Sequence, residues 1–154
     1  MILVALNLSL ETSHLVTASG KISSSNIPLP NNLPSGSCLV VYVQEELKDG
    51  FGPVLSESRI VDPSVQHGVI DYHLRFKPTS HQKYMLGAIL NVGWCGKGDE
   101  TLRNGDYVHN QLYLISINDG QYSFDKDIVV RKLPGRLLHG HSIFSNISLF
   151  IISS

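Results

Sequence analysis

Four side chains with oxygen ligands lie within one polar segment, and oxygen ligands are what a hard cation requires. Asp99, Glu100, Asn104 and Asp106 fall in residues 95–107, together with three glycines. Ca²⁺ takes roughly six to eight such oxygens from a flexible loop, although the spacing here is not that of an EF-hand. Asp, Asn and Gly are also the residues that turns favour. The segment therefore predicts a long loop that binds a partner or, as the alternative, calcium, another metal ion or a ligand.

A second candidate for metal binding is a pair of histidines near the end of the chain. His139 and His141 would point to the same side of an extended strand, because side chains alternate with a period of two. Zinc and copper sites need roughly three or four converging ligands. The pair alone does not complete a site, so we expect no metal centre and keep these histidines only as an adjunct to the metal-binding alternative.

No familiar catalytic motif occurs in this sequence. It lacks a Gly-x-Ser-x-Gly turn, a phosphate-binding loop and a His-Glu-x-x-His pair, which are signatures of hydrolases, nucleotide-binding enzymes and metalloproteases. We therefore predict that the protein is not an enzyme and uses no cofactor. A hydrolase whose Ser, His and Asp residues meet only in the folded chain is the remaining catalytic alternative.

The two cysteines, Cys38 and Cys95, are too far apart in sequence for zinc-ligand spacing. They permit one disulfide if their Cα atoms come within about 7 Å, and closing that loop would stabilise the fold by roughly 3–4 kcal/mol. Left unpaired, Cys95 would be a candidate reactive thiol beside the polar loop. Disulfides persist outside the cytoplasm, and two Asn-x-Ser sequons, at Asn7 and Asn146, would suit a secreted glycoprotein. We therefore expect a secreted or extracytoplasmic protein.

Length and charge exclude several classes of function. At 154 residues the chain is the size of one domain. Hydrophobic residues make up 42% and charged residues 16%, with a formal net charge of -1. That balance gives no electrostatic footprint for nucleic acid or an anionic membrane. No stretch reaches the roughly 20 apolar residues of a transmembrane helix, so we expect neither a nucleic-acid partner nor a membrane span.

Alternation with a period of two is the main structural signal. It is clearest in residues 70–77, where Ile70, Tyr72, Leu74 and Phe76 alternate with polar residues, as in a strand with one buried face. Residues 84–94, with Trp94 on the predicted core face, are apolar on both faces, which indicates either a strand covered on both sides or glycines that admit a neighbour's large side chain. Further strands are expected at residues 6–11, 14–22, 38–43, 54–61, 111–117, 122–124 and 127–133.

No window has a helical apolar period. The sequence therefore predicts an all-β protein, a single-domain antiparallel β-sandwich of seven to eight strands with little or no helix, spanning residues 1–135. Residues 136–154 form a C-terminal tail with an apolar stretch at 143–152. The sequence allows three interpretations of that tail: an extra strand, a glycolipid-anchor signal or a non-homologous end. The apolar start of the chain lacks the basic region and cleavage site of a signal peptide.

Several segments, taken in order, resemble one family. They are Gly20-Lys21-Ile22, residues 33–43, residues 70–76, and residues 84–90 followed by Gly93. Over residues 16–117 the chain resembles the YscW/YbaY-type family of bacterial outer-membrane lipoproteins and secretion-pilot chaperones. The resemblance implies a small β-sandwich that acts as a chaperone-like or interaction module. The bacterial members carry lipid on an N-terminal cysteine, which neither Cys38 nor Cys95 matches, so their anchoring and pilot function do not carry over.

These observations lead to one main hypothesis. The chain is expected to be a non-enzymatic, extracytoplasmic β-sandwich that binds a protein partner through a sheet edge or through the 95–107 loop, because edges and loops are where such scaffolds carry function. Exposed edge strands would also allow a homodimer by strand addition.

Overall fold

The structure is a computed structural model that describes residues 14–79 and 83–135. The described part of the chain contains no helix, hence none long enough to cross a bilayer. Its strands are β1 (Val16–Ser24), β2 (Cys38–Leu47), β3 (Gly50–Val61), β4 (Ile70–Phe76), β5 (Lys83–Asn91), β6 (Tyr107–His109), β7 (Tyr113–Ser116), β8 (Ser123–Asp125) and β9 (Ile128–Lys132). The all-β prediction is confirmed. The strand expected at residues 6–11, the tail, the sequons and the histidine pair His139 and His141 lie outside the described residues.

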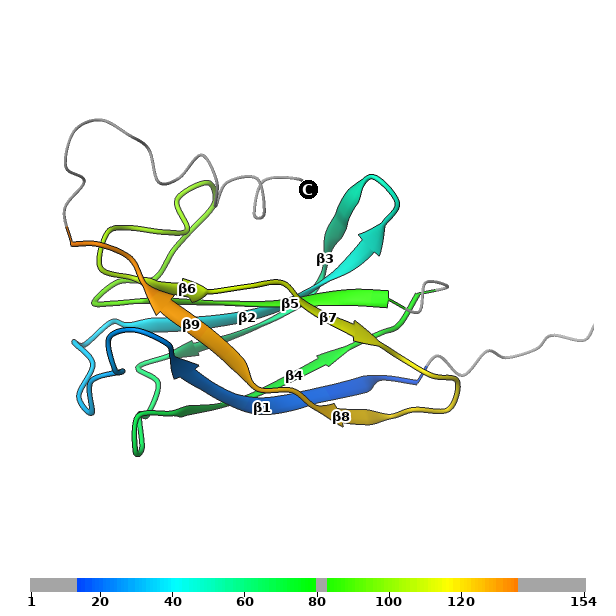
Figure 1. Cartoon of the computed structure of the whole chain (residues 1–154), viewed down its shortest axis with the longest axis horizontal. Coiled ribbons are helices and arrows are strands. Elements are labelled where there is room, and N and C mark those ends of the chain that lie inside the picture. The colour runs from blue at the N-terminus through cyan, green and yellow to red at the C-terminus, as the bar shows by residue number, and fades with distance from the viewer. Residues whose placement is uncertain (1–13, 80–82, 136–154) are drawn as a thin grey trace, which may run out of the picture.

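All nine strands belong to one curled sheet. Its order is β3-β2-β5-β6-β9-β1-β4, with β7 pairing β5 beside β6 and β8 pairing β1. The sheet folds over so that β2, β5 and β7 form one layer and β1, β4 and β8 the other, with β9 crossing between them (Figure 1). The end strands meet where the Ser56 hydroxyl donates to the Arg75 carbonyl at 2.6 Å. The result is a nearly closed, flattened barrel.

The pairing is not wholly antiparallel, which corrects one detail of the sequence prediction. β1 runs parallel to β8, with Thr17 opposite Ser123, and parallel to β9, with Ile22 opposite Ile128. All other strand pairs are antiparallel. Side-chain alternation has the same period in both orientations, so it carries no information about strand direction.

The β2–β3 hairpin is longer than the sequence indicated. The strands expected at residues 38–43 and 54–61 extend towards each other, because β2 runs to Leu47 and β3 begins at Gly50 and continues through Pro53. The register between β2 and β3 shifts at Val43/Gln44 and at Gln44/Glu46. Such β-bulges accommodate an extra residue on one of two paired strands. Pro53 is tolerated because β3 is an end strand, where a missing N–H breaks no ladder.

The core confirms the predicted inward faces. Ile70, Tyr72, Leu74 and Phe76 are each 2–3% exposed and pack against the inward residues of β5, which are Tyr84, Leu86, Ala88 and Leu90. The prediction was wrong for Trp94. β5 ends at Asn91, so Trp94 lies in the following loop and is only half-buried.

The outer face of β2 and β5 is also apolar. Tyr42, Met85, Ile89, Val108 and Leu133 form a second hydrophobic cluster there. Tyr42 lies opposite Gly87 in the register, and a Cβ at Gly87 would overlap the tyrosine ring. The second alternative for residues 84–94, a glycine that admits a neighbour's large side chain, is therefore confirmed.

Candidate functional site: a pocket on the outer face of the sheet

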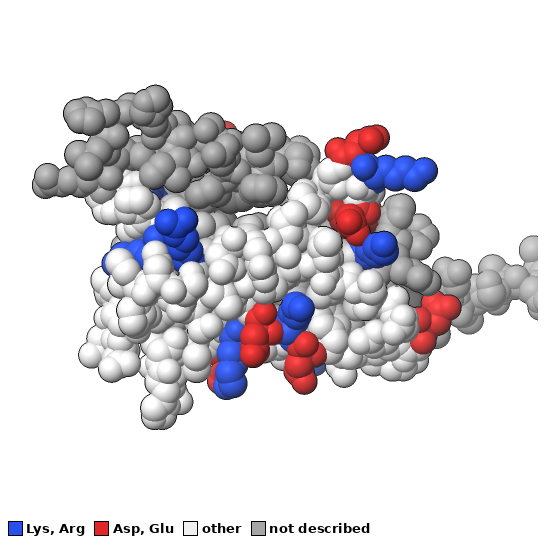
Figure 2. Space-filling model, in the orientation of Figure 1, with Lys and Arg blue, Asp and Glu red and all other residues white. Residues whose placement is uncertain are grey.

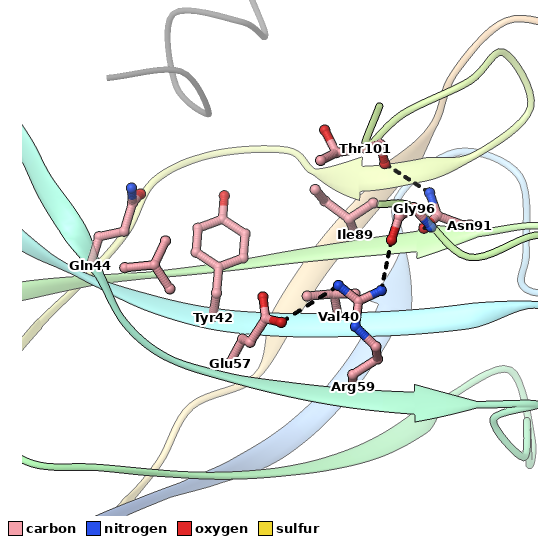
Figure 3. A pocket seen from close by; sticks show the side chains of 10 residues that line it. Val40, Tyr42, Gln44, Glu57, Arg59, Ile89, Asn91, Gly96 and Thr101 are labelled. Carbon is pink, nitrogen blue, oxygen red and sulfur yellow. Dashed lines mark hydrogen bonds and ion pairs between the residues drawn. The ribbon is translucent and has the colours of Figure 1, made fainter. Parts of the chain in front are cut away.

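A pocket of about 130 Å³ lies on this outer face, over β2, β3 and β5. The strand alternation places Val40, Tyr42 and Gln44 of β2 on the same side, and Figure 3 shows their side chains pointing away from the sheet. The lining residues, called here the outer-face pocket, are Val40, Tyr42, Gln44, Val54, Glu57, Arg59, Ile89, Asn91, Gly96 and Thr101. The walls are largely aliphatic and aromatic, with charged residues at one end.

Tyr42 brings a buried hydroxyl to this pocket. It is 6% exposed, and its oxygen has no hydrogen-bond partner among the residues that the structure describes. Burial raises the pKa of Tyr42 far above its ordinary value, so the phenol is neutral at physiological pH. A neutral phenol can both donate and accept a hydrogen bond. The ring itself is held by Gly87 beneath it and by an edge contact with His109, whose ring centroid is 6.1 Å away.

Gln44 supplies a second unpartnered polar atom. It is 1% exposed, and its Nε2 donates to the Gly52 carbonyl at 3.3 Å. Its Oε1 has no partner within residues 14–79 and 83–135. A buried polar atom left without a partner costs about 1–3 kcal/mol. Tyr42 and Gln44 are two residues apart on one strand face, a spacing of about 7 Å. A molecule that donates to Gln44 and hydrogen-bonds to Tyr42 would recover both costs.

Arg59 closes the charged end of the pocket (Figure 3). Its guanidinium donates to the Gly96 carbonyl at 2.9 Å and lies 3.5 Å from the Glu57 carboxylate. The same Nη1 atom lies 3.0 Å from the Cys95 sulfur. Cys95 forms a disulfide with Cys38, with Cα atoms 5.0 Å apart. The disulfide that the sequence permitted is therefore present, and it ties the start of β2 to the loop after β5.

The polar loop is organised by Asp106, one of the four oxygen ligands predicted from the sequence. Asp106 is 1% exposed. Its carboxylate accepts from the backbone N–H groups of Val92 and Arg103, both at 2.9 Å. It also accepts from Asn91 Nδ2 at 2.8 Å and from the Trp94 indole at 3.1 Å. The oxygens of Asp106 therefore point into the loop, where they hold the backbone.

The other three predicted loop ligands do not gather around Asp106. Asp99 and Asn104 are exposed, while Arg103 Nε donates to Glu100 at 2.7 Å and this bond lowers the pKa of Glu100. The Arg103 guanidinium also stacks 3.8 Å from the centre of the Trp94 ring. Within residues 14–79 and 83–135, no three His, Cys, Asp or Glu residues are placed to hold a metal ion. The one buried carboxylate of the loop, that of Asp106, is occupied by protein donors. Binding of a partner through residues 95–107 or, as the alternative, of calcium, another metal ion or a ligand stays a prediction.

The sheet edges are less open than the sequence indicated. The end strands β3 and β4 are bridged by Ser56 and Arg75, and Pro53 on β3 has no N–H to offer an added strand. Homodimerisation through an edge strand stays a prediction. On the face shown in Figure 2, acidic and basic side chains of the described residues are intermixed. Lys21 and Asp71 form an ion pair at 3.0 Å.

Tyr42, Gln44 and Arg59 were not among the site residues predicted from the sequence. The signal for this pocket was the Val-x-Tyr-x-Gln series on the outer face of β2. A sheet face in contact with water normally carries polar residues, so apolar residues there indicate a covered or binding surface. A glycine within residues 84–94 that admits a neighbour's large side chain was one of the two alternatives, but the register that sets Gly87 beneath Tyr42 depends on how the strands pair.

The sequence matches no protein-family model and no curated protein. Among solved structures it is similar to an alternative pilotin from the type II secretion system of Vibrio cholerae, with a TM-score of 0.48 and 18% identity over 82% of this chain and 99% of that chain. It is also similar to a 9R-lipoxygenase from Cyanothece, with a TM-score of 0.42 and 15% identity over 77% of this chain and 16% of that chain. Membership of the YscW/YbaY-type family stays a prediction.

Proposed function

We propose that the chain is an extracytoplasmic, non-enzymatic protein-binding module that holds one bulky side chain of a partner in the outer-face pocket. One observation carries this proposal. Two buried polar atoms, the Tyr42 hydroxyl and Gln44 Oε1, lie in a largely apolar pocket and have no partner in the described part of the chain. Interfaces draw most of their affinity from this kind of anchor, where a large side chain fills a desolvated pocket.

The size and chemistry of the pocket describe the occupant. Its volume of about 130 Å³ is close to that of an engineered cavity of about 150 Å³ that binds benzene. One aromatic ring or branched aliphatic side chain would therefore fill it. A polypeptide also brings backbone N–H and C=O groups, which would serve as the donor for Gln44 and as the partner for Tyr42.

The proposed location and the absence of catalysis rest on separate observations. A disulfide such as Cys38–Cys95 is typical of oxidising compartments outside the cytoplasm. Aliphatic groups, the Gln44 amide and a phenol that burial keeps protonated form most of the pocket, and at its charged end Glu57 is paired with Arg59 at 3.5 Å. These groups suit recognition, because neither a neutral phenol nor an amide acts as a general base at physiological pH and the one carboxylate is engaged in an ion pair.

The test is a selection of peptides from a random displayed library on the full chain. We expect the selected peptides to share one bulky aromatic or branched residue. Val54→Trp, at a half-exposed lining position, should abolish their binding by filling the pocket, and Tyr42→Phe should weaken it about two- to tenfold by removing one hydrogen bond. Val61→Trp is the matched control, because Val61 is an exposed valine on the same strand outside the pocket. Equal binding to the Val54→Trp and Val61→Trp variants would contradict the proposal.

A further inference from the structure

The Cys38–Cys95 pair is asymmetric in its electrostatic surroundings. Arg59 Nη1 lies 3.0 Å from the Cys95 sulfur and 3.9 Å from the Cys38 sulfur. The guanidinium is fixed in this position by its bonds to the Gly96 carbonyl and to Glu57. A cation beside a sulfur favours the thiolate over the thiol. The field of Arg59 therefore acts mainly on Cys95.

The two sulfurs also differ in access. Cys38 is 0% exposed at the start of β2, whereas Cys95 is half-buried in the loop. A thiolate must be reachable to attack another molecule. Charge and exposure thus single out the same residue.

We propose that Cys95 is the nucleophile and Cys38 the resolving thiol of a thiol–disulfide exchange couple, with Arg59 as the positioning residue that stabilises the Cys95 thiolate. The co-substrate belongs to the class of small-molecule disulfides. This inference goes beyond the proposed function and does not depend on it.

The exchange balances in two steps. In the reduced chain the Cys95 thiolate attacks one sulfur of the external disulfide; a Cys95–sulfur bond forms, the external S–S bond breaks, and the departing thiolate takes a proton from water. Cys38 then loses its proton and attacks the Cys95 sulfur, which forms the Cys38–Cys95 bond and releases the second external thiolate. The chain is oxidised by two electrons, and the external disulfide is reduced to two thiols.

The reduced chain keeps Cys95 in place without the disulfide. The Gly96 N–H donates to Asn91 Oδ1 at 2.9 Å, and Asn91 Nδ2 donates to the Thr101 carbonyl at 2.9 Å. Asp106 binds the backbone of Val92 in the same loop. These bonds hold the loop that carries Cys95 close to the start of β2, so the resolving step needs only a short movement.

The first test is a measurement on the reduced full chain. Limited alkylation with iodoacetamide at neutral pH, quantified at each cysteine by peptide mass spectrometry, should modify Cys95 at least about tenfold faster than Cys38, and the difference should vanish in urea. Arg59→Gln should slow the reaction at Cys95 about tenfold, Arg59→Lys should retain most of the rate, and Arg75→Gln should change nothing. Equal rates in the folded wild-type chain, or an unchanged Cys95 rate in Arg59→Gln, would overturn the proposal.

The second test traps the mixed disulfide. With glutathione disulfide as the probe, Cys38→Ser should accumulate an adduct at Cys95, because the resolving thiol is missing. Cys95→Ser should accumulate an adduct at Cys38 at least about tenfold more slowly. Faster adduct formation at Cys38 would reverse the assignment and overturn it.

Discussion

Both carboxylate oxygens of Asp106 lie 3.1 Å from the indole Nε1 of Trp94, which donates a shared hydrogen bond to them. The same carboxylate accepts the backbone N–H groups of Val92 and Arg103. This bond fixes the edge of the indole ring, and the Arg103 guanidinium stacks on the ring face. One buried carboxylate therefore joins several parts of the loop after β5.

Replacing Asp106 should destabilise the fold strongly. Asp106→Ala leaves several buried donors without a partner, so we expect the free energy of unfolding to fall by about 3 kcal/mol or more. Urea denaturation followed by tryptophan fluorescence measures the change. Asp99→Ala is the control, because Asp99 is an exposed acid in the same loop and should change the free energy by less than about 0.5 kcal/mol. Similar losses in both variants would show that Asp106 is not the organiser of the loop.

Calcium should not stabilise this protein. The predicted ligands Asp99, Glu100 and Asn104 do not converge on Asp106, whose oxygens are occupied by protein donors. We expect no shift in Tm and no calorimetric heat at about 1 mM Ca²⁺, the range of weak extracellular sites. A saturable heat that disappears in Asp99→Ala would restore the loop as a cation site.

Gly87 should not tolerate a side chain. Gly87→Ala places a methyl group against the Tyr42 ring, and we expect a loss of about 1–3 kcal/mol in the free energy of unfolding from overpacking. The effect should be much smaller when Tyr42→Ala is also present, because residues in contact are not additive. Gly135→Ala is the control, since a Cβ there meets no atom within 4 Å. An additive double mutant would mean that the ring does not lie over Gly87.

Acid should weaken the fold through His109. Burial of the ring lowers the pKa of His109, against a smaller opposing effect from the Ala88 carbonyl. The unfolded chain therefore binds the proton more readily, so the stability from a neutral His109 is present above about pH 6.5 and is lost as pH falls below it. Unfolding free energies between about pH 5 and 7 should depend less on pH in His109→Gln than in wild type. The exposed His73→Gln variant should keep the wild-type slope, and the same reduced slope in both variants would contradict the assignment.

Local alternation was enough to predict the inward faces of β4 and β5, because burial on one face leaves a pattern of period two in residues such as Leu74 and Leu86. It could not predict that β1 pairs in parallel with β8 and β9. Strand direction and neighbours are set by long-range packing, which no local window contains.

The site was harder to predict for the same reason. A buried Asp106 and an exposed Asp99 are the same residue type in the same turn-rich segment, and only the folded loop shows which one binds backbone N–H groups. The pocket likewise arises where Tyr42 of one strand lies over Gly87 of the next. The cysteine pair was the exception, because two cysteines allow only one intramolecular bond.

The disulfide also determines whether proteolytic fragments of the protein stay covalently linked. Cys38 and Cys95 are separated by 57 positions, and β2, β3, β4 and β5 lie between them. A single cut anywhere in that interval leaves both halves joined by a covalent bond. The nicked protein would run as one species on a gel without reductant and as two fragments after reduction, so this half of the sheet can lose a peptide bond without losing a strand.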